Sequence, residues 1–181
     1  MKIPNIKIKY NPYLDRIFSE WVASKSEYKA WVRPADAKIK DRTGSFNGIW
    51  EEKGAKILAK ICEKTGLHFK RNHFTIHIVS ANPRSYSDPI VISVSRNADE
   101  FFETAIHELI HCLFVDNARS LFVKRSDKLP DHVALYAVME SAMRGTVNKR
   151  TRDPKHNGVY RTAKSIVKQK GYKDIIEGLK A

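Results

Sequence analysis

Residues 98–115 constrain the fold most strongly, because this stretch of the 181-residue chain contains neither Gly nor Pro. Asn97 is a favourable N-cap residue, and Glu100 stands at the position of the reciprocal partner in a capping box. Apolar residues recur every three or four positions and define one wide face: Phe101, Phe102, Ala105, Ile106, Leu109, Ile110, Leu113 and Phe114. The pattern predicts an amphipathic helix whose apolar face packs into a core.

The polar side of this predicted helix carries two histidines, with a carboxylate beside the first. Positions i and i+4 of a helix point the same way, so His107 and His111 can bind one metal ion. Zn²⁺ bound by imidazoles, with one position left for water, lowers the pKa of that water to about 7. Glu108 can accept a proton from the water and return it to a leaving amine. This is the chemistry of an amide hydrolase, although so short a pattern also arises by chance.

Residues 107–111 read His-Glu-Leu-Ile-His and resemble HExxH, the signature of the zincin superfamily of zinc metallopeptidases. The resemblance implies that a third ligand comes from further along the chain. The metzincin continuation is absent, because it requires Gly and His where this chain has Phe114 and Asn117.

Two candidates for the third ligand stand on a second predicted helix that begins near position 130. His132, Tyr136 and Glu140 are spaced i, i+4 and i+8, so they share one face. Glu140 lies 29 residues beyond the second histidine and would give the ligand set of the gluzincins. The gluzincin pattern favours Asp one turn later, where this chain has Arg144.

His132 lies 21 residues beyond the second histidine and resembles the third ligand of the SprT/Spartan type of zincin. In that family a third histidine follows a charged loop and opens the next helix, as residues 126–132 do here. The resemblance favours His132, with Glu140 as the alternative. Tyr136, one turn after His132, would stabilise the oxyanion if its ring faces the cleft.

The SprT-like resemblance covers only residues 98–143. Val133 replaces the Gly that commonly follows the third histidine in that family. Cys62 and Cys112 are the only cysteines, which argues against a disulfide framework and excludes the four-Cys zinc ribbon of many SprT-like proteins.

Upstream of the HExxH helix, one helix and two strands are predicted in the order that the zincin resemblance requires. Residues 48–65 are expected to form the helix, and residues 74–79 and 90–94 the strands. In zincins an edge strand aligns an extended peptide over the zinc. By that resemblance the second strand is the expected edge. The expected substrate-binding residues are Ile90, Ile92 and Val94.

The amino-terminal region is expected to be accessory to this core. Residues 13–31 carry apolar side chains at helical spacing and predict an accessory helix. Residues 34–48 are polar and contain Gly, which predicts a connector.

Positive charge is the second indication of function. The formal net charge is +13, and residues 144–181 hold eleven Lys or Arg against three carboxylates. Such a segment suits an anionic partner, and nucleic acid is the usual one. The expected phosphate contacts are the basic residues in 149–152 and, further along, Arg161, Lys164, Lys168, Lys170 and Lys173, with Tyr160 as an aromatic neighbour. Residues 159–176 also contain enough Ile, Val and Tyr to pack as an ordinary closing helix.

No apolar run approaches the roughly 18 residues that a membrane span requires. The first residues show no signal-peptide pattern. We therefore expect a cytoplasmic protein without a membrane partner.

These features predict an α+β protein with a zincin-like fold. A small mixed β-sheet would pack on the HExxH helix, followed by a ligand-bearing helix and a basic C-terminal helix. The expected division is an accessory segment (1–47), a metallopeptidase core (48–145) and a basic extension (146–181). The expected activity is zinc-dependent hydrolysis of protein or peptide substrates. The alternative is a catalytically silent, nucleic-acid-binding protein that uses a zincin scaffold.

Overall fold

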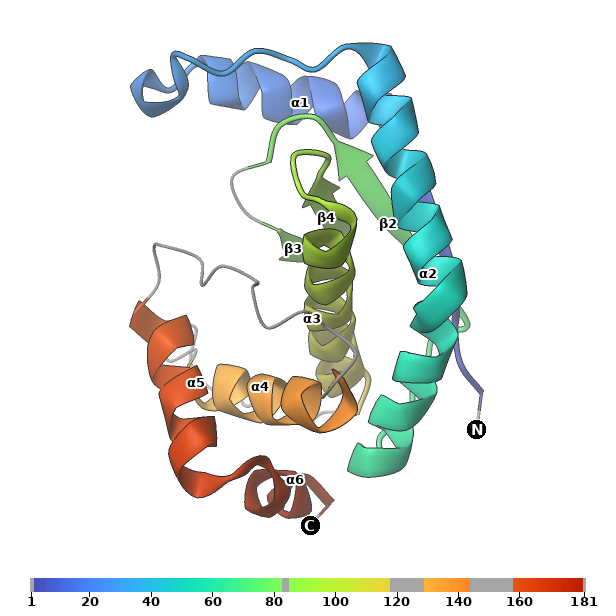
Figure 1. Ribbon diagram of the computed structural model, residues 1–181, viewed down its shortest axis with the longest axis vertical. Helices are drawn as coiled ribbons and strands as arrows, with labels where there is room; N and C mark the ends of the chain where they lie inside the picture. The colour runs from blue at the N-terminus through green and yellow to red at the C-terminus, as the bar shows by residue number, and fades with distance from the viewer. Residues whose placement is uncertain (1, 83–84, 118–128, 144–157, 181) are drawn as a thin grey trace. The chain divides into compact units, whose positions relative to one another are not determined.

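The computed structural model describes residues 2–82, 85–117, 129–143 and 158–180 (Figure 1). These residues form six α-helices, one short 3-10 helix and one four-stranded sheet that contains both parallel and antiparallel pairs. The predicted α+β class and the small mixed sheet are thereby confirmed.

The chain divides into two compact units. The sheet unit comprises Pro4–Gly54 and Asn72–Leu109, and the helical unit comprises Met1–Ile3, Ala55–Arg71 and Ile110–Ala181. Helices α2 (Asp36–Thr65) and α3 (Ala98–Asp116) each run from one unit into the other. The expected boundary at residue 47 falls inside α2, and the one at residue 145 lies outside the described residues.

The sheet has the strand order β1-β2-β4-β3. Its strands are β1 (Asn5–Tyr10), β2 (His73–Val79), β3 (Tyr86–Ser87) and β4 (Ile90–Ser93). Parallel pairs join β1 to β2 and β2 to β4, whereas β3 is antiparallel to β4. The two predicted strands are found as β2 and β4.

Strand β1 lies in the segment that was expected to be accessory. It pairs along its whole length with β2, with Ile8 opposite Ile76. Ile8 is buried, whereas Lys7 and Lys9 on either side are exposed. This alternation is the period of a half-buried strand, so the first residues belong to the sheet.

Helix α2 begins twelve residues before its predicted start, so the predicted connector at 34–48 is wrong over most of its length. Its polar side chains do not break the helix, because they bond to backbone carbonyls four residues earlier. Thr43 Oγ1 donates to Ile39 O (2.8 Å) and Asn47 Nδ2 donates to Thr43 O (2.9 Å). Buried Ile39 and Phe46 supply the apolar contacts that stabilise this part of the helix.

Aromatic contacts join α2 and α3 in the sheet unit. The rings of Phe46 and Phe101 stack at a centroid separation of 4.2 Å, and Trp50 lies 5.9 Å from Phe102. Such pairs contribute roughly 0.5–1.5 kcal/mol beyond the apolar area that they bury. They fix the part of α3 that precedes the histidines.

Helix α1 (Pro12–Ala23) is shorter than the predicted helix at 13–31. Asn11 caps its start by accepting hydrogen bonds from the backbone of Tyr13 and Leu14. At its other end Ser24 Oγ donates to Trp21 O, and a 3-10 turn (Ser26–Tyr28) follows. Side chains that bond to the backbone in this way favour turns over continued helix.

The helical unit is built around α4 (Leu129–Met143), which contacts both α5 (Gly158–Lys170) and α6 (Tyr172–Lys180) (Figure 1). The buried residues of these three helices include Leu135, Val138, Ala163, Val167, Ile176 and Leu179. The predicted closing helix is therefore present, but Gly171, at φ +81°, interrupts it. A positive φ is adopted easily by Gly alone, which explains the break.

Two predicted features lie outside the described residues: the basic cluster at 149–152 and most of the charged loop before His132. Among the residues that are described, no helix combines the length and the hydrophobicity needed to cross a bilayer.

Candidate metal centre

A capping box sets the start of α3 as expected. Asn97 Oδ1 accepts a hydrogen bond from Glu100 N (2.9 Å), and Glu100 Oε2 accepts one from Asn97 N (3.2 Å). Because the first turn is fixed, the direction in which each later side chain leaves the helix is also fixed. His107 and His111 therefore project from successive turns of one continuous helix.

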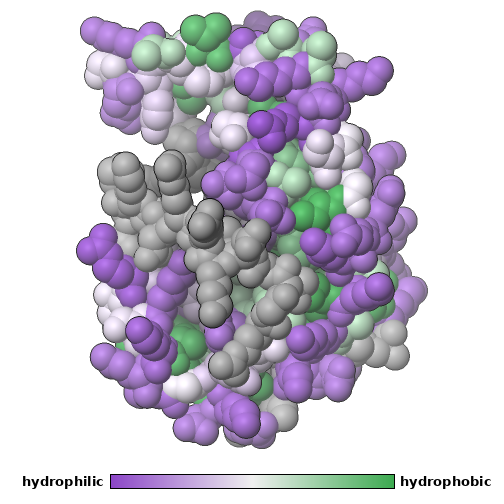
Figure 2. Space-filling view, viewed as in Figure 1, coloured by the Kyte–Doolittle hydropathy of each residue, from purple (hydrophilic) through white to green (hydrophobic). Residues whose placement is uncertain are grey.

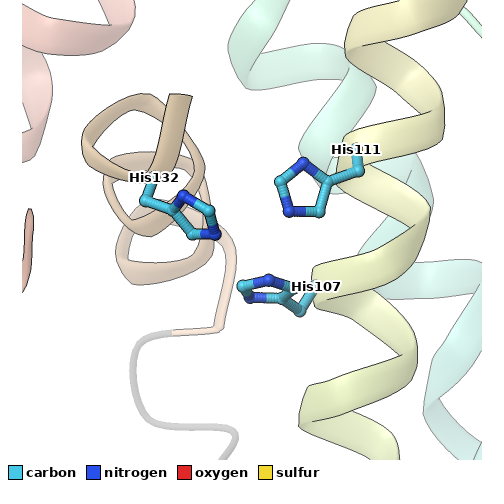
Figure 3. A group of neighbouring side chains, drawn as sticks. All are labelled: His107, His111 and His132. Carbon is cyan, nitrogen blue, oxygen red and sulfur yellow. The ribbon is translucent and has the colours of Figure 1, made fainter. Parts of the chain in front are cut away.

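Three histidines come together, two from α3 and one from α4 (Figure 3). The ligand atoms of His107, His111 and His132 all lie within 4.8 Å of one another. The rings of His111 and His132, both in the helical unit, are 5.2 Å apart and nearly perpendicular. His132 is buried and the other two are half-buried.

The donor set fits a zinc ion. Tetrahedral zinc with Zn–N bonds of about 2.1 Å holds its nitrogens roughly 3.4 Å apart. The limit of 4.8 Å is wider, and rotation about χ2, a broad torsion in histidine, can close the difference. Three imidazoles leave a fourth tetrahedral position for a water or a substrate.

Glu140, the alternative third ligand, is not a member of this group. It is exposed, whereas His132 is buried. Eight residues along an α-helix correspond to about 12 Å along the axis and about 80° of rotation. The two candidates share a face in projection, but only His132 reaches the other histidines.

Glu108 is buried beside the first histidine, with 6% of its surface exposed. Ser87 Oγ, on β3, donates a hydrogen bond to Glu108 Oε2 (2.7 Å). Burial raises the pKa of Glu108 to about 7, although the Ser87 hydrogen bond and the positive charge of Arg96 oppose this shift. A carboxyl group with a pKa near neutrality is suited to both accepting and donating a proton.

Arg96 supplies positive charge near this carboxylate. It is half-buried in the connection from β4 to α3, and its Nη2 atom lies 3.5 Å from Ser85 Oγ. Burial lowers the pKa of Arg96, whereas the carboxylates of Glu100 and Glu108 raise it. Ser85, Ser87, Arg96 and Glu108 all belong to the sheet unit.

Tyr136 is half-buried one turn beyond His132 on α4. Its ring lies 6.4 Å from the ring of Tyr160, and Lys164 Nζ lies 5.1 Å from the centroid of the Tyr136 ring. Tyr160 also lies 4.7 Å from the ring of His132. Helix α5, in the segment expected to be a basic extension, thus contacts the side of α4 that carries the third histidine.

Strand β4 was expected to align a peptide substrate because it was expected to be an edge of the sheet. Strand β4 is not an edge, because it pairs with β2 on one side and with β3 on the other. The side chains of Ile90, Ile92 and Val94 are almost completely buried. In the described sheet the edges are β1 and β3, and Tyr86 on β3 is 44% exposed.

Ser87, Arg96 and Tyr160 are the site residues that the sequence pattern misses. Ser87 and Tyr160 are distant in sequence from the groups that they contact. No local periodicity or spacing marks them. The one sequence signal is the position of Arg96 between a predicted strand and the capped helix.

The fold and the site define an α+β protein with a three-histidine group that could hold a metal ion and a buried carboxylate, Glu108, that follows the first histidine in sequence. Comparison with protein-family models, curated proteins and solved structures finds no match for this chain.

Proposed function

We propose that the protein is a zinc-dependent metallopeptidase of the zincin type. The observation that supports this most strongly is the convergence of His107, His111 and His132, together with the burial of Glu108, the residue that follows the first of them. A zinc ion bound there would act as a Lewis acid and lower the pKa of a water to about 7.

The roles of the protein groups follow from their positions. Glu108 would take a proton from the attacking water and deliver it to the leaving amine nitrogen. Ser87 and Arg96 would hold this carboxylate in place, one by a hydrogen bond and the other by its charge. Tyr136 would donate a hydrogen bond to the oxyanion that develops on the substrate carbonyl.

An extended peptide is the substrate that suits the edge of this sheet. Ser87 on β3 contacts Glu108 on α3, so this edge strand lies beside the proposed general base. A peptide that pairs with β3 would place its backbone next to Glu108, with main-chain hydrogen bonds supplying affinity. The strand proposed to pair with the substrate is therefore β3, not β4.

An anionic partner is also part of the proposal. Arg161, Lys168 and Lys170 are exposed on α5, and Ala163 and Val167 are buried on its other side. At the lower left of Figure 2, where α5 lies, most of the coloured residues are hydrophilic. With the charge of residues 144–181, this surface supports a SprT-like peptidase that acts on proteins bound to nucleic acid.

Glu108→Gln tests the catalytic role. The variant keeps the shape of the side chain but cannot accept the proton, so cleavage of an unfolded protein substrate should fall by at least about 100-fold. Zinc content, measured by mass spectrometry, should stay near that of the wild type. Undiminished cleavage by the variant would refute the proposed mechanism.

The metal site is tested by the zinc content of two variants on α4. His132→Ala should lose most of its zinc, whereas Glu140→Ala, the matched control, should retain it. Loss of zinc in Glu140→Ala alone would contradict the three-histidine site. Zinc-free wild-type protein, together with salt-sensitive DNA binding, would instead support the catalytically silent alternative.

A further inference from the structure

We propose that Tyr160, on helix α5, is a positioning residue that orients the imidazole of His132 for metal binding. The inference rests on the proposed three-histidine site. It assigns part of the C-terminal segment to that site, in addition to any role as a basic surface.

The contact is direct and lies within the helical unit. The ring of Tyr160 lies 4.7 Å from the ring of His132, with an interplanar angle of 81°. On the same imidazole, the ring of His111 lies 5.2 Å away at 74°. His132 is thus in edge-to-face contact with one neighbouring ligand and with one aromatic side chain from another helix.

Orientation matters because the imidazole torsion is soft. The χ2 angle of histidine has broad minima, so a ring without neighbours can turn its nitrogen away from the metal. Edge-to-face packing with Tyr160 narrows that range before the metal binds. Groups that orient a metal ligand commonly change metal affinity by about 10–100-fold when they are removed.

Helix α5 is anchored well enough to hold this ring. Ala163 and Val167, on successive turns after Tyr160, are buried, and the helix contacts α4. Tyr160 also contacts Tyr136 at 6.4 Å, and Lys164 lies over the ring of Tyr136. The same turn of α5 therefore contacts both the proposed third ligand and the proposed oxyanion donor.

The test measures Zn²⁺ affinity in the full-length protein by competition with a chromophoric chelator. Tyr160→Phe keeps the ring and should bind Zn²⁺ like the wild type. Tyr160→Leu keeps much of the apolar volume but removes the ring, and should bind about tenfold more weakly. Circular dichroism of the metal-free variants establishes that each is folded.

Two further variants separate positioning from general stabilisation. Ile176→Ala weakens the core of the helical unit on α6, a helix that carries none of the proposed site residues, and should leave Zn²⁺ affinity unchanged. In a His132→Ala background, Tyr160→Leu should cause no additional loss, because its effect acts through that imidazole.

Each unfavourable result has a distinct meaning. Wild-type affinity in Tyr160→Leu, equal weakening in Tyr160→Phe, or equal weakening in Ile176→Ala would overturn the positioning role while leaving the proposed peptidase intact. So would an undiminished effect in the His132→Ala background. Wild-type protein that binds no Zn²⁺ would overturn the proposed function itself, and this inference with it.

Discussion

Three glycines within helix α2 should respond in opposite ways to the same substitution. Gly44 and Gly48 are exposed, and a Cβ added at either would meet nothing within 4 Å. A Cβ at Gly54 would lie 2.4 Å from Cε2, 2.6 Å from Cδ2 and 2.8 Å from Cζ2 of Trp50. Because carbon atoms pack at about 3.5–4.0 Å, the indole would have to move by roughly 1 Å.

The magnitudes follow from two opposing effects. Replacing Gly by Ala inside a helix stabilises the fold by about 0.8–1.0 kcal/mol. Overpacking a core costs about 1–3 kcal/mol, and Trp50 is buried against Phe102 on α3. Gly54→Ala should therefore lose the stabilisation expected of Ala and destabilise by up to about 2 kcal/mol, whereas Gly44→Ala and Gly48→Ala should stabilise by about 0.5–1 kcal/mol.

Urea denaturation of the three variants tests this reasoning, with thermal melting as a second measure. A change of 1 kcal/mol should move the Tm by about 2–4 °C for a chain of this size. In a Trp50→Leu background the indole is gone, so Gly54→Ala should no longer destabilise. Stabilisation by Gly54→Ala in the wild-type background, equal to that at Gly44, would refute the reasoning.

Three further predictions concern pH, metal removal and the general base. Burial alone would raise the pKa of Asp15, but hydrogen bonds from Ser80, Tyr10 and Arg33 lower it below its usual value. The stability that this carboxylate contributes is present above its unfolded pKa of about 3.9 and is lost as pH falls through the lower folded pKa. Acid titration of unfolding should therefore show a steeper loss of stability below about pH 4 in the wild type than in Asp15→Asn, and equal slopes would contradict the assignment. Adding a chelator should lower the Tm of the zinc-loaded wild type but not that of His132→Ala. Zinc present at 100 times its Kd stabilises the folded protein by about 2.7 kcal/mol. Scanning calorimetry with and without the chelator measures the change in Tm, and equal changes in the two proteins would contradict the site. Ser87→Ala should reduce kcat by about 10–100-fold without changing zinc content, since a hydrogen bond to a charged group contributes about 1.5–3 kcal/mol. Steady-state kinetics and metal analysis measure the two quantities, and an unchanged kcat would contradict the role given to Ser87.

Local sequence signals predict α3 almost completely. The helix was expected at 98–115 and is found at Ala98–Asp116, with the Asn97–Glu100 capping box formed. Caps, the absence of Gly and Pro, and apolar periodicity all act within a few residues of one another. The spacing of His107 and His111 is a consequence of the same helical geometry.

Elements whose formation depends on partners distant in sequence were predicted less well. The first half of α2 packs on α3 through Phe46 and Phe101, and β1 pairs with β2, which is distant in sequence. Which strand forms the sheet edge depends on the short β3, whose two residues carry no strand pattern. These errors share a cause, because pairing and packing over long sequence separations leave no local trace.

By itself, the sequence determined a helix that presents two imidazoles and a carboxylate, and two candidates for a third ligand on the next helix. The tertiary structure alone distinguished buried His132 from exposed Glu140, brought Ser87 to Glu108, and packed Tyr160 against His132. The physical reason is the range of the interactions. Helical periodicity depends on neighbours three or four residues apart, whereas a metal site is completed by side chains that meet only when separate helices and strands pack.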